Sequence, residues 1–223
     1  MNLDFDYIVL IFPKVLAYLP TTLWMALISM LFAMSIGLML ALIKLKGVRV
    51  INAIIDFYIS IFRGIPTLVQ LFLIYFGLPQ LFPILNGIDA ITAAIIGFSL
   101  KNSAYMAEIY RAGLSSVEFG QMEAGLTIGM TRGQVFRRII IPQAMLNTLP
   151  ATGNTFISLI KETSVAFALG VTELFAEGKM IAAESLRYFE TFIVVGVIYW
   201  LTVVVYGWIQ SFIESKLRYG LDR

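Results

Sequence analysis

The sequence contains neither cysteine nor histidine among its 223 residues. Without cysteine there are no disulfides or thiolate metal sites, and without histidine the commonest general base and metal ligand is missing. Charge is scarce as well, because 13% of residues are charged where a soluble domain carries about 25%. A net charge of +2 is too small to indicate nucleic-acid binding. These absences argue against a soluble enzyme, a metalloprotein and a nucleic-acid-binding protein.

Hydrophobic residues make up 59% of the chain. This content, together with long uncharged runs, predicts a multi-pass all-α integral membrane protein with a single domain over residues 1–223. The first residues, MNLDFDYIV, are acidic where a signal peptide would be basic, so we expect the N-terminus to be retained. Aromatic and acidic residues in the segment 1–14 favour a helix at the membrane interface.

Five apolar segments are long enough to span a bilayer of about 30 Å. The predicted spans are residues 15–43, 52–77, 88–110, 148–170 and 191–213. Small residues recur every fourth position in the first span, which predicts a seam for close helix packing. These residues are Ser29, Ala33, Gly37 and Ala41.

The second and fourth spans are interrupted by polar and helix-breaking residues. Gly64 and Pro66 divide the second, because proline lacks an N–H donor and clashes with the preceding turn. We predict one span broken in its middle; the alternative is a surface helix to residue 62 followed by a span from residue 65. The sequence KETS at 161–164 interrupts the fourth span, and residues 171–189 are predicted to form a mixed-charge loop.

Lysine and arginine are distributed unequally between the two sets of loops, which predicts the orientation. Ten basic residues, including Lys44, Arg111 and Arg223, follow the first, third and fifth spans. Only Lys14, Lys179 and Arg187 lie on the other side. The sequence therefore predicts an external N-terminus and a cytoplasmic C-terminus.

The cytoplasmic loop 111–147 contains the one long polar, glycine-rich interval of the chain, at residues 118–144. Gly125, Gly129 and Gly133 recur every fourth position, and each disfavours a helix by about 1 kcal/mol relative to alanine. We therefore predict two short helices that break near Gly129 and present a bare glycine face on which another protein docks. The alternative is an amphipathic loop on the membrane surface.

Three basic residues, Arg63, Lys101 and Lys161, fall inside predicted spans. A cation at mid-depth costs about 2.5–3.5 kcal/mol by insertion scales, so each needs a partner or water. Glu162 is the acidic candidate; it does not face its neighbour Lys161 on a helix and is predicted to meet Arg63 or a ligand. Lys101 is interpreted as a structural charge that neutralises another residue.

The broken second span frees backbone groups at mid-depth, and such breaks are tolerated where they line a cavity. Polar side chains follow the break and recur in the KETS segment, so the two segments together predict a substrate path. The residues of this predicted path are Arg63, Gly64, Pro66, Thr67, Gln70, Lys161, Glu162 and Ser164.

The segment EAGLTIGMTRGQVFRRIIIP at 123–142 resembles the EAA loop of the membrane subunits of ABC importers. The resemblance covers nearly the whole chain, and the segments FRGIPTLVQ and KETS resemble paired signatures of the polar amino acid branch. Gly125 and Ile141 replace the usual alanine and leucine, and Ile65 stands where threonine is usual. In the family this loop couples to a cytoplasmic ATPase; the corresponding residues here are Glu123, Ala124, Gly125, Gly129, Thr131, Arg132 and Pro142.

The resemblance implies a type I importer permease in a bacterial plasma membrane that moves a polar amino acid, with cystine as a specific candidate and arginine, glutamine and histidine as alternatives. It also implies a second permease copy, two ATP-binding subunits and an external solute-binding protein. The chain has no phosphate-binding loop. That motif reads Gly, four residues, Gly-Lys, and the pair Gly178-Lys179 has Glu173 at the position of the first glycine. ATP and Mg²⁺ are therefore expected on the partner ATPase, with no cofactor in this chain.

Two other classes of function remain as alternatives. An ion-coupled secondary carrier would use Glu162 and Arg63 to carry a proton and would transport without an ATPase. An intramembrane enzyme would need a nucleophile and a base, and no such pair is recognisable from the spacing of residues.

Overall fold

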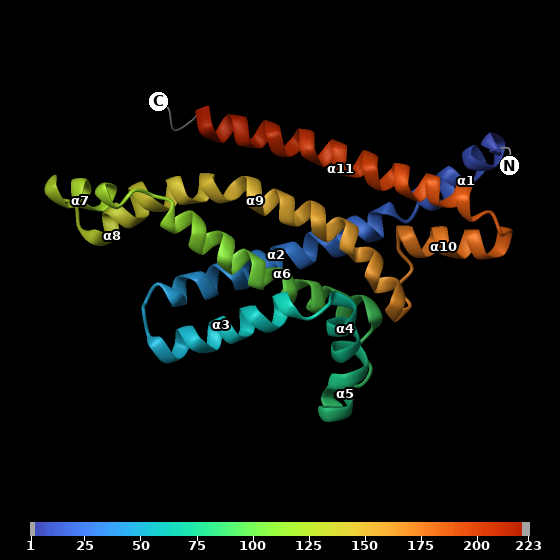
Figure 1. Cartoon of the computed structure of the whole chain (residues 1–223), viewed down its shortest axis with the longest axis horizontal. Helices are drawn as coiled ribbons and strands as arrows, with labels where there is room; N and C mark the ends of the chain where they lie inside the picture. Colours follow the sequence, from blue (N-terminus) through green and yellow to red (C-terminus); the bar gives the residue numbers. More distant parts are fainter. Residues whose placement is uncertain (1–2, 220–223) are drawn as a thin grey trace.

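The computed structural model describes residues 3–219, and every regular element in that range is a helix. Figure 1 shows an elongated arrangement in which α7 (Phe119–Thr127) and α8 (Arg132–Val135) lie at one end of the long axis. Helices α1 (Phe5–Leu16) and α10 (Leu174–Ser185) lie at the opposite end. The long helices connect the two ends, so the predicted all-α fold is confirmed for the described part of the chain.

Helix α1 leads almost directly into α2 (Leu19–Lys44), and together they form an apolar stretch of 40 residues. Asp4 caps α1 by accepting a hydrogen bond from the Tyr7 N–H at 3.0 Å, and Arg187 donates to the same carboxylate at 2.5 Å. Both contacts favour the ionised form of Asp4, and the hydrogen bond from the Tyr7 N–H has the larger effect. Together they hold the pKa of Asp4 below its ordinary value of 3.8. The lead-in is helical, and one face of it packs against α10 and α11 (Tyr188–Tyr219).

The predicted small-residue seam of α2 is buried against α6 (Ala90–Ser115). A Cβ atom at Gly37 would lie 2.5 Å from the Cβ of Met106, so the two backbones approach too closely for any larger residue. The Ser29 hydroxyl donates to the Ile95 carbonyl at 3.4 Å across the same interface. Close packing through small residues is therefore confirmed for this helix pair.

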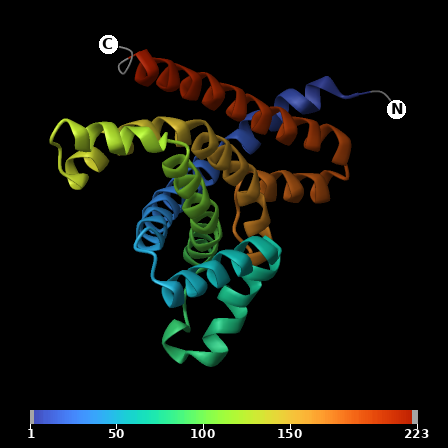
Figure 2. The ribbon, with the colours of Figure 1, turned by 60° about the vertical axis from the view of Figure 1, so that its left-hand side comes forward.

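The second predicted span breaks where the sequence indicated, between α3 (Arg49–Gly64) and α4 (Thr67–Phe72). The two arms are bent by 108° at residues 65–66, so they do not continue along one line. Figures 1 and 2 show the α4 arm turning away from α3 and projecting from the body of the molecule. The rest of this arm comprises the π-helical segment η1 (Leu73–Gly77), α5 (Leu78–Leu81) and the 3-10 turn η2 (Pro83–Leu85).

The fourth long helix, α9 (Ile141–Glu162), begins directly after a π-helical turn, η3 (Phe136–Ile140), so the second half of the predicted loop 111–147 is largely helical. Helix α9 crosses α6 at Gly113, where the methyl group of Thr148 occupies the space that a side chain would need. At Glu162 the α-helix ends and the chain tightens into a 3-10 segment, η4 (Thr163–Leu169). The interruption predicted at residues 161–164 is thus a change of helix type.

The mixed-charge loop predicted at residues 171–189 is wrong, because most of this segment is helix α10. The apolar residues Leu174 and Ala182 bury one face of it, so the alternation of charged and apolar residues reflects an amphipathic helix. Helix α11 is also longer than the predicted fifth span. Of the ten basic residues predicted to lie on the side of the C-terminus, Arg223 and the side chain of Arg218 lie outside the described residues.

The largest buried cluster lies where α2, α6 and α9 meet, so these helices hold the candidate site in place. Its fully buried members include Met25, Phe98, Met106, Leu159 and Ile160. A second cluster joins α1 to α10 and α11 through Ile11 and Val15. A third joins α3 to α6 through two buried alanines.

Candidate functional site

Gln70 stabilises the break between α3 and α4. Its amide nitrogen donates to the Phe62 carbonyl at 3.0 Å and to the Ile65 carbonyl at 2.7 Å. In an unbroken helix the Phe62 carbonyl would accept from residue 66, but Pro66 has no N–H. Gln70 therefore supplies the donor that Pro66 lacks, while Gly64 remains in open space beside the bend.

This role differs from the one predicted for Gln70 on the substrate path. Its side chain is 4% exposed and faces the inside of the bend. Its amide oxygen is buried without a hydrogen-bond partner among the described residues. The sequence places Gln70 one turn after Pro66 but does not show that its side chain folds back over the freed carbonyls.

Three polar side chains from three helices meet at the start of α4. Thr67 Oγ1 donates to Glu162 Oε1 at 2.5 Å, and Lys101 Nζ donates to Thr67 Oγ1 at 2.6 Å. Lys101 also forms an ion pair with Glu162. The three side chains form a triad that joins α4, α6 and the end of α9, and a cation and an anion inside the bundle neutralise each other.

The triad corrects the expectation that Glu162 meets Arg63. Arg63 is exposed and its guanidinium stacks on the Tyr105 ring, 5.2 Å from the ring centroid. The interpretation of Lys101 as a neutralising charge agrees with its ion pair to Glu162. Sequence reasoning could not select this partner, because it depends on how α6 packs against α9.

A polar cavity of about 580 Å³ opens beside the triad. Of the predicted path residues, Lys161, Glu162 and Ser164 line it, and Ser164 donates to the Lys161 carbonyl at 2.7 Å. Arg63, Gly64, Pro66 and Gln70 are not among its lining residues, and Thr67 reaches it through Glu162. Seven further residues line it that the sequence analysis did not select for the path: Lys101, Asn102, Tyr105, Asn154, Thr155, Ser158 and Val165.

A signal for some of these residues was present in the sequence. Asn154, Ser158 and Glu162 are spaced by four residues, which places them on one face of α9. That polar stripe inside an otherwise apolar span indicates a surface that faces a polar space. The cavity therefore combines a carboxylate, two ammonium groups, amides and hydroxyls, a set that can bind both charged ends of a zwitterion.

Helices α7 and α8 form a hairpin, residues 119–135, at the far end of α9. Gly129 turns the chain with φ +85°, a left-handed conformation that favours glycine. Thr131 and Gln134 then form a reciprocal capping box at the start of α8. The prediction of two short helices that break near Gly129 is confirmed.

The bare glycine face predicted for this hairpin is wrong. Gly125 is buried against Val135, and a Cβ atom there would lie 2.5 Å from the valine side chain. Gly129 lies in the turn and Gly133 in α8, so the three glycines do not share a helix face. They cannot align because the chain reverses at the second of them.

The exposed surface of the hairpin consists of polar and apolar side chains and not of bare glycines. Exposed members of the predicted coupling set are Glu123, Ala124, Gly129, Thr131 and Arg132, whereas Gly125 is buried and Pro142 is half-buried in the first turn of α9. Phe119 is 79% exposed and Ile128 is 76% exposed. Exposed aromatic and aliphatic side chains among charges are typical of a protein docking surface.

Glu173 is a buried charged residue that the sequence analysis treated as part of a loop. It is fully buried and caps α10 by accepting from the Ala176 N–H at 2.8 Å. Thr22 and Tyr199 donate to its second oxygen at 3.2 and 3.0 Å. This carboxylate therefore ties α2, α10 and α11 together at the end of the molecule opposite the hairpin.

Comparisons with known proteins agree with this architecture. Residues 33–219 match the family described as binding-protein-dependent transport system inner membrane component. The chain is 55% identical to the probable amino-acid permease protein YxeN of Bacillus subtilis (strain 168), over 97% of this chain and 96% of the relative. It is 46% identical to the probable amino-acid ABC transporter permease protein PatM of Vibrio harveyi, over 98% of each.

A solved structure described as an amino acid ABC transporter with histidines matches with a TM-score of 0.88 and 36% identity, covering 97% of this chain and 100% of the other. An inward-facing MetNI methionine ABC transporter shares the fold, with a TM-score of 0.72 and 21% identity over 91% and 95% of the two chains. The match to the family spans most of the sequence, including the hairpin and the triad's Lys101 and Glu162. The chain therefore belongs to the family of binding-protein-dependent transport system inner membrane components.

Proposed function

We infer that this chain is the permease subunit of an ABC importer for amino acids. Relatives at 55%, 46% and 36% identity are named as an amino-acid permease, an amino-acid ABC transporter permease and an L-cystine permease. Each of them aligns with at least 97% of this chain. The inference also agrees with the polar cavity, which offers groups of both signs to a zwitterion.

The proposed substrate is a polar amino acid. Glu162 can accept a hydrogen bond from its ammonium group, while Lys161 and the nearby amides and hydroxyls can donate to its carboxylate. Cystine is the specific candidate, but the relatives named for cystine transport are 36% and 40% identical and one named for arginine transport is 35% identical, so these identities do not select between the two substrates. Mass spectrometry of the solute that co-purifies with the complex would identify the substrate.

Coupling to ATP is proposed to run along α9. One observation carries this proposal: α9 joins the exposed hairpin at one end to Glu162 at the other without leaving helical structure. We propose that two ATPase subunits grip the hairpins of two permease copies, with ATP and Mg²⁺ bound by the ATPases. Movement of the hairpin would then shift Glu162 and with it the wall of the cavity, and an external solute-binding protein would deliver the substrate.

The orientation is proposed from the unequal distribution of lysine and arginine. Because the chain has no cysteine, single cysteines introduced on each side report it cleanly. A cysteine in place of Ile128, in the hairpin, should be labelled by an impermeant maleimide only from the cytoplasm. A cysteine in place of Leu186, at the opposite end, should be labelled only from outside, and the reverse pattern would contradict the orientation.

A reconstituted complex tests the function. Glu162→Gln removes the charge that is proposed to bind the substrate ammonium, and a hydrogen bond to a charged group contributes about 1.5–3 kcal/mol. We therefore expect the KM for uptake to rise about 10- to 150-fold. Asp56→Asn is the control, because Asp56 is an exposed acid that pairs with Lys44 away from the cavity.

The energy source separates this proposal from an ion-coupled carrier. An importer requires ATP and its ATPase subunits, whereas a carrier would transport in vesicles that contain this chain alone under a proton gradient. Uptake by the chain alone would refute the importer assignment.

A further inference from the structure

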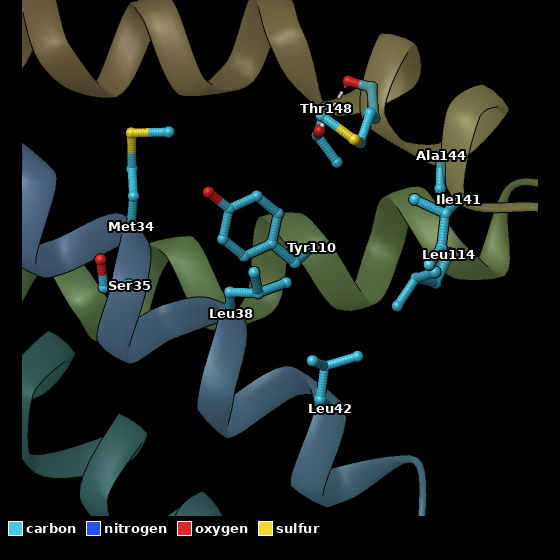
Figure 3. Close-up of a pocket in the computed structure, with 10 residues that line it drawn as sticks. Met34, Ser35, Leu38, Leu42, Tyr110, Leu114, Ile141, Ala144 and Thr148 are labelled. Atoms are coloured by element: carbon cyan, nitrogen blue, oxygen red, sulfur yellow. Dashed lines mark hydrogen bonds between the residues drawn. The ribbon is translucent and has the colours of Figure 1, made fainter. Parts of the chain in front are cut away.

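A second cavity, of about 410 Å³, lies between α2, α6 and α9 in the half of the bundle next to the hairpin. Figure 3 shows side chains from all three helices converging on it. Its lining residues are Met34, Ser35, Leu38, Leu42, Tyr110, Leu114, Ile141, Ala144, Met145 and Thr148. This volume falls within the range of about 300–1,000 Å³ that is usual for ligand sites.

The cavity faces away from the polar substrate cavity. Tyr110 lies nine residues after Lys101, and Leu114 nine residues after Tyr105. Nine residues are two and a half turns of an α-helix, so the two cavities contact opposite faces of α6. If the polar cavity faces the path between two permease copies, this apolar one opens towards the hydrocarbon of the bilayer.

The walls favour an apolar chain as occupant. The Ser35 hydroxyl donates to the Leu31 carbonyl at 2.9 Å and the Thr148 hydroxyl to the Met145 carbonyl at 2.8 Å, so neither has a proton left to donate to a ligand. The Tyr110 hydroxyl points into the space between α2 and α9 in Figure 3 and makes no hydrogen bond within residues 3–219. A single free hydroxyl in an apolar groove suits the ester region of a lipid, whose hydrocarbon tail fills the rest.

Basic residues flank the end of the cavity near the hairpin. Arg137 and Arg138 lie in the π-helical turn η3, which leads directly into α9 and its lining residue Ile141. Both are exposed and neither forms an ion pair in the part of the chain that the structure describes. They border a polar depression that also contains Thr131 and Gln134.

We propose that this cavity binds one acyl chain of an anionic phospholipid of the cytoplasmic leaflet, with its phosphate near Arg137 and Arg138. The proposal rests on the orientation given under the proposed function. Because the acyl chain would lie between the helices that meet the hairpin, the bound lipid would form part of the element that transmits movement along α9. A second copy of the chain is the competing occupant, and the experiment below separates the two.

Native mass spectrometry of the full chain, extracted with the subunits that accompany it, tests the proposal. The probes are phosphatidylglycerol and phosphatidylcholine with the same acyl chains, added in equal amounts. We expect one phosphatidylglycerol per permease chain to be retained in preference to phosphatidylcholine. Arg138→Gln should reduce that preference about fivefold, the usual contribution of one basic residue at an anionic surface.

Ser35→Phe places an aromatic ring in the cavity and should abolish retention of either lipid. Met39→Phe is the matched control, because Met39 is exposed on the next turn of α2 and does not line the cavity. Leu38→Trp is a second filling variant, in case Ser35→Phe does not assemble. Equal retention of the two lipids by the wild type would overturn the proposal, as would lipid retention by both filling variants.

Loss of the permease dimer in the filling variants, without a change in retained lipid, would assign the cavity to a second copy and also overturn the proposal. Lipid retention does not depend on transport. A complex that retains phosphatidylglycerol but shows no ATP-dependent uptake would therefore refute the proposed function and not the lipid site.

Discussion

Replacing Gln70 with leucine tests whether this side chain maintains the break between α3 and α4. The substitution leaves the Phe62 and Ile65 carbonyls without the amide donor that they share. Each buried carbonyl left unpaired costs about 1–3 kcal/mol, and loss of the unpaired Gln70 oxygen returns a similar amount. The net destabilisation is therefore about 1–3 kcal/mol.

The assay is thermal unfolding of the purified complex, followed by size-exclusion chromatography with fluorescence detection. For a chain of this size each kcal/mol lowers the midpoint by about 2–4 °C, so a decrease of about 2–12 °C is expected. Gln70→Met should behave in the same way, because a thioether has no hydrogen to donate to a carbonyl.

Pro66→Ala provides the decisive comparison. Alanine restores an N–H at position 66, which lets α3 continue and satisfies the Phe62 carbonyl within the helix. The Gln70→Leu change should then cost less stability in the Pro66→Ala background, yet uptake should fall because Thr67 moves away from Glu162. A Gln70→Leu protein with wild-type stability and uptake would refute this account of the break.

Three other substitutions follow from single contacts. Gly153→Ala should lower the unfolding midpoint, because a Cβ atom there overlaps the Gln210 side chain and overpacking costs about 1–3 kcal/mol. A second change, Gln210→Ala, should restore the midpoint, and failure to restore it would contradict this contact. Glu173→Ala should destabilise the complex by about 1–3 kcal/mol for each buried donor left unpaired, and Glu173→Gln by less, as measured in the same thermal assay. Gly129→Ala should separate ATP hydrolysis from uptake, because the positive φ of Gly129 costs alanine about 1–2 kcal/mol. Gly133→Ala is its control, since that position is open, and normal coupling in Gly129→Ala would show that the turn tolerates strain.

The sequence predicted the parts of this structure that depend on local chemistry. The seam of α2, the break at Gly64 and Pro66 and the turn at Gly129 are each specified by residues within one or two helical turns. The family signature identified the hairpin because its glycine, glutamate and proline spacing is local as well.

The parts that could not be predicted depend on contacts between distant segments. The partner of Glu162 is Lys101, 61 residues away, and the partners of the buried Glu173 lie on two other helices. Glu173 gave no signal, because a single glutamate among several charges is typical of a solvated loop. The role of Gln70 could not be predicted either, since the sequence does not show towards which side of the bend its side chain turns.

The ion pair between Lys101 and Glu162 has a consequence for binding strength. The carboxylate proposed to attract a substrate ammonium is already neutralised by a tethered ammonium of the same chain. An incoming amino acid must compete with the Lys101 ammonium for Glu162. Its apparent affinity is therefore the intrinsic affinity multiplied by the fraction of molecules in which Glu162 is free. Such competition would disfavour long retention within the bilayer and would make release depend on the return of Lys101 to its place.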